Sequence, residues 1–202
     1  MPDIIAETLA TYGRIARARL AAALQPLDPQ ADMAAVESFL MRTGRPLPTV
    51  VVLGGNLALR CMQVDRAGGR AVGVDGVETV IELARRLYPQ GEFLVGDARA
   101  LPVDTNAFDG AWTESVFSHV PRKDVSTAMA SVHGALRPGG LLYVRLPLGD
   151  DEGFEDTPDG PIYRVRWDAR QFEQTLAALD FSLLEMRDLP GPEAALVFRR
   201  EY

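Results

Sequence analysis

The stretch VVVLGGNLA at residues 50–58 limits the fold more than any other part of the chain. An uninterrupted apolar run that ends in glycines is typical of a strand buried on both faces of a parallel sheet. Glycines allow a tight turn and a close approach of the backbone to a ligand. The helix expected at 57–67 would direct its free N–H groups toward that space. Strand, glycine turn and helix together predict a nucleotide-type ligand at the carboxyl edge of the sheet.

Length and composition describe an ordinary globular chain with an excess of negative charge. The 202 residues suffice for one sizeable domain, and 47% hydrophobic with 24% charged residues is usual for globular proteins. We therefore expect a single domain over 1–202, with N-terminal helices in 1–45 and an α/β core in 46–202. The net charge of −7 argues against nucleic acid as a partner, because phosphate binding relies on Lys and Arg.

The expected environment follows from cysteine content and hydropathy. Cys61 is the single cysteine, which excludes an internal disulfide and fits a reducing compartment. No apolar run approaches the roughly 20 residues that span a bilayer, and the N-terminal residues lack a secretory pattern. We expect a cytoplasmic protein without a membrane partner.

Two helices are expected ahead of the first strand. Apolar residues recur at helical spacing over 3–24. Asp28 is then placed as the N-cap of a second helix, with Pro29 in its first position and its end near Arg42. We expect these helices to cap the ligand-binding edge of the sheet.

Strands and helices alternate from residue 49 onward. The expected strands are 49–53, 70–74, 92–95, 108–112 and 141–146, and the expected helices between them are 57–67, 77–87 and 123–136. An acidic surface loop is expected at 149–160, a helix opened by a capping box at 168–179, and a hairpin of strands 181–189 and 194–199. This order predicts an α/β fold, a Rossmann-like and mainly parallel sheet with helices on both faces and one antiparallel strand near its edge.

The residues directly after each predicted strand are the candidates for ligand binding, because open α/β sheets bind ligands at that edge. They are Gly54, Gly55 and Asn56, then Asp75, then Asp97 and Ala98, and finally Thr113 and Glu114. Asp75 follows Gly54 by about 20 residues, the separation at which a carboxylate accepts hydrogen bonds from a ribose. Two acids at neighbouring strand ends suit an adenosine better than a triphosphate, whose charge they would repel.

Several short motifs carry a family resemblance when they are taken in order. They are VVVLGG, GVD ending at Asp75, VGDARALP at 95–102, FDGAW at 108–112, SHVP at 118–121, LRPGGLLYV at 136–144 and, near the N-terminus, YGRIA at 12–16. The chain resembles the class I S-adenosylmethionine-dependent methyltransferases, in the group that acts mostly on small molecules. The resemblance spans roughly Tyr12 to the C-terminus and implies that Tyr12 lies over a bound cofactor.

The resemblance assigns the adenosine half of the cofactor to five residues. Asp75 would bind both ribose hydroxyls, and Gly76 or Val77 would pack against the adenine. Asp97 would accept a hydrogen bond from the adenine amino group, and the Ala98 backbone N–H would donate one to a ring nitrogen.

The methionine half and the methyl acceptor are assigned in the same way. Gly54 and Gly55 would lie against the methionine part, and Thr113 and Glu114 would border its amine and the sulfonium. His119 would stand at the boundary between cofactor and substrate, which makes it the candidate catalytic residue.

The glycine turn departs from the family pattern. Val52 stands where the family has an acid, and Asn56, Leu57 and Ala58 replace the end of a G-x-G-x-G loop. Asn tolerates a positive φ better than other non-glycine residues, so we expect the turn to persist at Asn56. Leu57 and Ala58 are expected to add bulk where the methionine part would lie.

Three functions follow from these observations. The first is transfer of a methyl group to a small-molecule acceptor by direct displacement, which needs positioning and no metal. The alternative is a catalytically inactive relative that serves as a binding or partner protein, supported by the altered glycine turn. The third is a nicotinamide-dependent reductase, which shares the turn and the ribose acid but would need a Tyr-x-x-x-Lys that this chain lacks.

Overall fold

The computed structural model describes residues 4–22, 33–114 and 116–202. Its main feature is a seven-stranded sheet in the order β3-β2-β1-β4-β5-β9-β8. Its strands are β1 (Thr49–Leu53), β2 (Arg70–Asp75), β3 (Glu92–Val95), β4 (Phe108–Thr113), β5 (Leu136–Pro147), β8 (Phe181–Leu189) and β9 (Glu193–Arg200). The helices are α1 (Ile4–Ala22), α2 (Met33–Arg42), α3 (Leu57–Arg66), α4 (Glu78–Leu87), α5 (Arg122–Ala135) and α6 (Ala169–Ala177), with a 3-10 turn η1 (Val116–Ser118).

The predicted topology of the sheet is confirmed. Strands β1 to β5 pair in parallel, and β9 is antiparallel to both of its neighbours, β5 and β8. The central strand β1 is buried on both faces, with Val50, Val51 and Val52 at most 1% exposed. The apolar run that predicted a parallel strand is thus explained by helices covering both sides.

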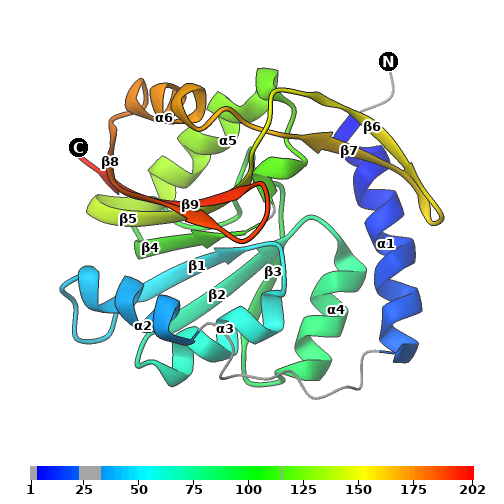
Figure 1. The fold of residues 1–202 in the computed structure, drawn as a ribbon. Coiled ribbons are helices and arrows are strands. Elements are labelled where there is room, and N and C mark those ends of the chain that lie inside the picture. The colour runs from blue at the N-terminus through cyan, green and yellow to red at the C-terminus, as the bar shows by residue number, and fades with distance from the viewer. Residues whose placement is uncertain (1–3, 23–32, 115) are drawn as a thin grey trace.

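Helices cover both faces of the sheet (Figure 1). Helices α5 and α6 pack on one face, and α2, α3 and α4 pack on the other. Helix α2 rests on the second face through Phe39, whose ring meets Trp112 edge to face, while Trp112 stacks on Tyr143 at 3.8 Å. The expectation that both N-terminal helices cap the ligand-binding edge therefore holds for α1 only. The predicted cap at Asp28 and Pro29 lies outside the described residues.

Helix α1 crosses the carboxyl edge of the sheet and contacts α4 and the hairpin strand β7 (Gly160–Val165) (Figure 1). Thr8 Oγ1 accepts a hydrogen bond from the Tyr163 backbone N–H at 2.9 Å, and Thr11 Oγ1 donates to the Pro161 carbonyl at 2.8 Å. These bonds join residues that are 150 and 155 positions apart in the sequence. Helix α1 and strand β7, joined in this way, cover the sheet edge at which the candidate residues lie, and we call them the roof.

The prediction of an acidic surface loop at 149–160 is wrong. The segment contains strand β6 (Glu152–Thr157), which pairs with β7 (Gly160–Val165) in a separate antiparallel hairpin. Arg166, directly after β7, lies 2.9 Å from Glu155 on β6, and Arg164 on β7 lies 3.3 Å from the same carboxylate. The acidic composition did not predict a strand, because the arginines that balance its negative charge belong to the chain segment paired with it.

Helix boundaries moved by one or two residues from those expected. Val77 is the N-cap of α4 rather than its first residue, and α5 ends at Ala135, where β5 begins at once with the LRPGG segment. The predicted capping at Asp168 is confirmed, because its carboxylate accepts from the Gln171 backbone N–H at 2.8 Å. No helix in the described ranges is long and apolar enough to cross a membrane.

Candidate functional site

The glycine turn after β1 depends on two residues with left-handed backbone. Gly54 has φ of 61° and Gly55 of 67°, whereas Asn56 has φ of −80° and caps α3. The expectation that Asn56 preserves the turn through a positive φ is therefore wrong, since the turn is complete before it. A Cβ atom on Gly54 would lie 2.8 Å from the Val116 side chain, so only glycine fits there.

Leu57 and Ala58 do not crowd the turn. Both side chains are buried in the core between α3 and the sheet, 2% and 5% exposed. Leu57 lies against Gly73 of β2, where an added Cβ would come within 3.0 Å of its Cγ. The bulk that replaces the family's small residues is thus absorbed by the core.

Asp75 ends β2 beside the glycine turn. Its Oδ1 accepts a hydrogen bond from the Val77 backbone N–H at 2.8 Å, and its Oδ2 lies 3.8 Å from the position of a Cβ on Gly54. No hydrogen bond to Oδ2 is found within residues 4–22, 33–114 and 116–202. Burial raises the pKa of Asp75 to about 6, only partly offset by the Val77 hydrogen bond. A half-buried carboxylate therefore has one oxygen bonded to the backbone and the other facing the turn.

Asp97 follows β3, next to the end of β2, where the Gly96 N–H donates to the Asp75 carbonyl at 3.0 Å. Its carboxylate is held by Arg99, with guanidinium contacts of 2.6–3.1 Å and a backbone N–H bond of 2.8 Å. Burial alone would raise the pKa of Asp97, but hydrogen bonds and the charge of Arg99 outweigh it and lower the pKa. The two predicted acids lie at neighbouring strand ends. The carboxylate of Asp97, however, is already hydrogen-bonded to Arg99, which was not predicted from the sequence.

Helix α1 covers the segment after Asp75. A Cβ on Gly76 would lie 3.1 Å from Leu9, and a Cβ on Gly13 would lie 3.8 Å from Val77. The surface assigned to the adenine is thus closed on one side by α1.

The end of β4 carries Thr113 and Glu114. Thr113 is 1% exposed, and its Oγ1 has no hydrogen-bond partner within the part of the chain that the structure describes. Glu114 forms a partly buried ion pair with Arg60 of α3, with Oε1 2.5 Å from Nη2. Arg60 is not among the residues predicted from the sequence, although it lies on the buried face of α3 with Leu57, Cys61 and Val64.

His119 joins the roof to the sheet. Its Nδ1 lies 2.8 Å from the Tyr163 carbonyl of β7 and therefore donates, which leaves Nε2 to accept from the Tyr12 hydroxyl of α1 at 2.9 Å. Burial, with a smaller contribution from the charge of Arg164, lowers the pKa of His119 to about 4 despite the Tyr163 hydrogen bond and the charge of Glu155. The ring is therefore neutral near pH 7 and contacts both elements that cover the site.

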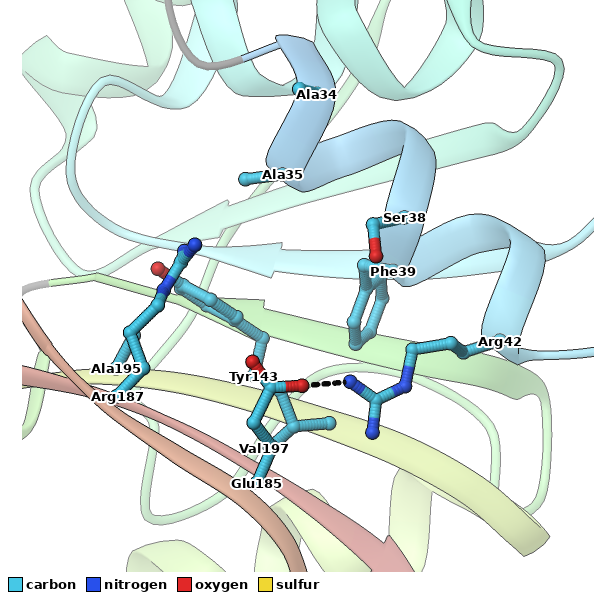
Figure 2. Close-up of a pocket in the computed structure, with 10 residues that line it drawn as sticks. All are labelled: Ala34, Ala35, Ser38, Phe39, Arg42, Tyr143, Glu185, Arg187, Ala195 and Val197. Carbon is cyan, nitrogen blue, oxygen red and sulfur yellow. Dashed lines mark hydrogen bonds and ion pairs between the residues drawn. The ribbon is translucent and has the colours of Figure 1, made fainter.

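A separate cavity of about 150 Å³ opens between α2 and strands β5, β8 and β9. Figure 2 shows Phe39 and Tyr143 in its wall and the ion pair of Arg42 with Glu185 on one side. None of the residues predicted from the sequence for the site lines this cavity.

Comparison with known proteins places these motifs in a family. Residues 52–144 match the family model of a methyltransferase domain. An uncharacterised 37.1 kDa protein of transposon TN4556 from Streptomyces fradiae is 35% identical over 100 residues, 48% of this chain and 28% of that protein. Demethylmenaquinone methyltransferase of Chlorobaculum tepidum is 30% identical over 94 residues, 46% of this chain and 37% of that enzyme. The chain thus aligns with roughly a third of the length of these curated relatives.

The fold is shared with solved structures over almost the whole chain. The complex of DhpI with SAH superposes with a TM-score of 0.73 at 20% identity, covering 98% of this chain and 97% of DhpI. The methyltransferase-domain match and this fold agree with each other and with the motifs at the strand ends. Residues 52–144 thus match a methyltransferase domain, and the fold of the whole chain is that of solved S-adenosylmethionine-dependent methyltransferases.

Proposed function

We propose that the protein binds S-adenosylmethionine and transfers its methyl group to a small-molecule acceptor. The observation that carries this proposal is the half-buried carboxylate of Asp75, whose Oδ2 faces the glycine turn without a hydrogen-bond partner among the described residues. A carboxylate oxygen that faces the site can accept hydrogen bonds, and a pair of ribose hydroxyls would supply two donors.

The other groups at the strand ends fit the same ligand. The buried hydroxyl of Thr113, which has no partner in the described part of the chain, offers a donor or an acceptor. Glu114 offers a negative charge close to the turn, with Oε2 3.6 Å from the position of a Cβ on Gly55. A carboxylate there suits the ammonium of the methionine part. The surface that we assign to the adenine is made of Gly76, Val77 and Ala98, beside the Asp97 carboxylate that Arg99 holds.

When bound, the cofactor supplies a methyl group activated by its sulfonium. The chain then has to hold the acceptor in line with that group and to exclude water, which is chiefly a matter of positioning. Helix α1 and the β6–β7 hairpin form the wall that can do this. His119, whose Nε2 accepts the Tyr12 hydroxyl bond, is the residue we assign to the boundary between cofactor and acceptor.

A small molecule is the acceptor class that best fits the closed site. The roof of α1 and β7 is hydrogen-bonded over the strand ends. The net charge of −7 disfavours nucleic acid, and the relative from Chlorobaculum tepidum is named for a small-molecule acceptor. We place the reaction in the cytoplasm, in keeping with the single buried cysteine.

Isothermal titration with S-adenosylhomocysteine tests the cofactor assignment. Wild-type protein is expected to bind it, and Asp75→Ala is expected to bind at least about tenfold more weakly, or about 1.4 kcal/mol. The matched control is Asp188→Ala, because Asp188 is exposed on β8, at the far edge of the sheet from Asp75. Unchanged affinity in Asp75→Ala would show that another group holds the ribose.

The inactive binding protein remains a second candidate because of one feature. Leu9 of α1 packs over Gly76, on the surface assigned to the adenine. If Leu9 keeps that surface closed, the folded wild-type protein will not bind S-adenosylhomocysteine at millimolar concentration. Binding of the ligand without transfer to any acceptor in a methyl-transfer screen would also favour this candidate.

A further inference from the structure

A buried arginine stands behind the acid at the end of β4. Arg60 is 5% exposed and places its guanidinium 5.1 Å from the ring centre of Trp112. Its Nη1 donates to Gln63 Oε1 at 2.8 Å, and its Nη2 lies 2.5 Å from Glu114 Oε1. Gln63 is fully buried, so the guanidinium is held on three sides by α3 and β4. An arginine is seldom buried so completely without a specific partner.

The ion pair gives the two oxygens of Glu114 different surroundings. Oε1 is directed toward the core, where Arg60 holds it. Oε2 is directed toward the glycine turn, 3.6 Å from where a Cβ of Gly55 would stand. The carboxylate therefore lies between the Arg60 guanidinium and the turn, with one oxygen committed to the protein and the other turned to the site.

We propose that Arg60 is a positioning residue that fixes Glu114 so that Oε2 receives the ammonium group of the cofactor's amino-acid part. This inference rests on the proposed function and assigns a role to a residue that does not itself touch the ligand. Charge-assisted hydrogen bonds from an arginine hold a carboxylate in one orientation. Without Arg60, Glu114 would lose both its fixed orientation and the partner that stabilises its charge in a buried place.

The test compares two ligands that differ only at the group in question. S-adenosylhomocysteine carries the ammonium and carboxylate, and 5′-methylthioadenosine has the same adenosine and a thioether but no amino-acid part. Both are titrated into wild-type protein, Arg60→Met and Glu114→Gln. Arg66→Met is the matched control, since Arg66 is exposed on the same helix.

We expect Arg60→Met to weaken S-adenosylhomocysteine by about tenfold or more and 5′-methylthioadenosine by less than about twofold. Arg66→Met should change neither. Arg60→Lys keeps the charge but not the planar fork, so it should recover part of the lost affinity. Because both residues act on one contact, Arg60→Met combined with Glu114→Gln should bind S-adenosylhomocysteine no more weakly than Glu114→Gln alone.

Each remaining outcome decides the question. Equal weakening of both ligands by Arg60→Met, or additive effects in the double variant, would overturn the positioning role and leave the proposed function standing. Failure of wild-type protein to bind either ligand would overturn the proposed function and this inference with it. If Arg60→Met does not fold, the double variant, which leaves no unpaired buried charge, is compared with Glu114→Gln in its place.

Discussion

At the scale of single residues, the turn depends on a backbone conformation that only glycine adopts without strain. Gly54→Ala puts a Cβ at φ of 61° and 2.8 Å from Val116. We expect the variant to lose about 1–3 kcal/mol of stability in chemical denaturation and at least about tenfold in affinity for S-adenosylhomocysteine. Gly44→Ala is the control, because Gly44 has φ of 67° but nothing within 4 Å of an added Cβ. It should lose stability and keep its affinity.

The second residue-scale prediction concerns pH. Ribose hydroxyls donate to an ionised carboxylate, and burial raises the pKa of Asp75 to about 6. Affinity for S-adenosylhomocysteine is therefore expected to fall as pH drops below about 6, in titrations at a series of pH values. Asp75→Asn should bind weakly at every pH, without this inflection. A wild-type affinity that stays constant between about pH 7 and pH 5 would contradict the assignment.

The same shift has a consequence for stability in the free protein. The folded protein binds more protons at Asp75 than the unfolded chain between the ordinary pKa of 3.8 and about 6. This group therefore lowers the free energy of unfolding as pH rises through that window. His119, whose pKa is lowered from 6.5 to about 4, acts in the opposite direction and adds stability as pH rises through its own window. Above pH 6, Asp75→Asn is accordingly expected to be more stable than wild type.

At the scale of secondary-structure elements, Asp109 ties together three segments at the amino edge of the sheet. Its Oδ2 accepts from the Thr49 backbone N–H at 2.9 Å, and its Oδ1 lies 2.6 Å from Arg137 of β5 and 3.4 Å from Arg45. Asp109 is 6% exposed, so these bonds replace its lost hydration. The FDGAW motif thus serves the start of β1 and β4 rather than the ligand edge.

The prediction from this contact separates stability from binding. Asp109→Asn is expected to lower the free energy of unfolding by about 2 kcal/mol, since Arg137 and Arg45 lose a charged partner. Affinity for S-adenosylhomocysteine should be unchanged, because the substitution lies at the opposite edge of the sheet from Asp75. Denaturant melts and a titration of the same preparation check both parts. A loss of affinity with no loss of stability would show that the motif serves the site.

At the scale of the whole molecule, the roof over the site is held by bonds between distant segments. Tyr12 of α1, His119 after β4 and Tyr163 of β7 form one hydrogen-bonded chain. Tyr12→Phe removes one hydroxyl and leaves His119 Nε2 without that donor. We expect hydrogen exchange in α1 and β7 to become faster. S-adenosylhomocysteine should dissociate about fivefold faster, which corresponds to the loss of one hydrogen bond of about 1 kcal/mol.

The control for this prediction is Tyr202→Phe, at a tyrosine that is 85% exposed near the C-terminus. It should leave exchange and dissociation at wild-type values. In wild-type protein, S-adenosylhomocysteine is expected to slow exchange in both α1 and β7. Protection limited to the strand ends would mean that α1 and β7 do not close over the ligand.

The sequence by itself determined the elements and the strand ends. The run before Gly54 predicted β1, and alternation of strands and helices predicted a mainly parallel sheet with one antiparallel strand near its edge. Parallel strands bring their carboxyl ends to one edge, so Gly54, Asp75 and Thr113 could be predicted to be neighbours. These inferences succeed because periodicity and turn chemistry act over a few residues.

The tertiary structure alone decided which of these groups have partners. Arg60 forms an ion pair with Glu114, and Arg99 forms one with Asp97. The ring of His119 is hydrogen-bonded to residues of both α1 and β7. The same holds for the hairpin at 152–165, whose acidic strand is balanced by arginines from its partner. Charge and hydrogen-bonding capacity are legible in a sequence, but the partner that satisfies them depends on packing between segments far apart in the chain. A residue's pKa and its availability to a ligand are consequences of that packing.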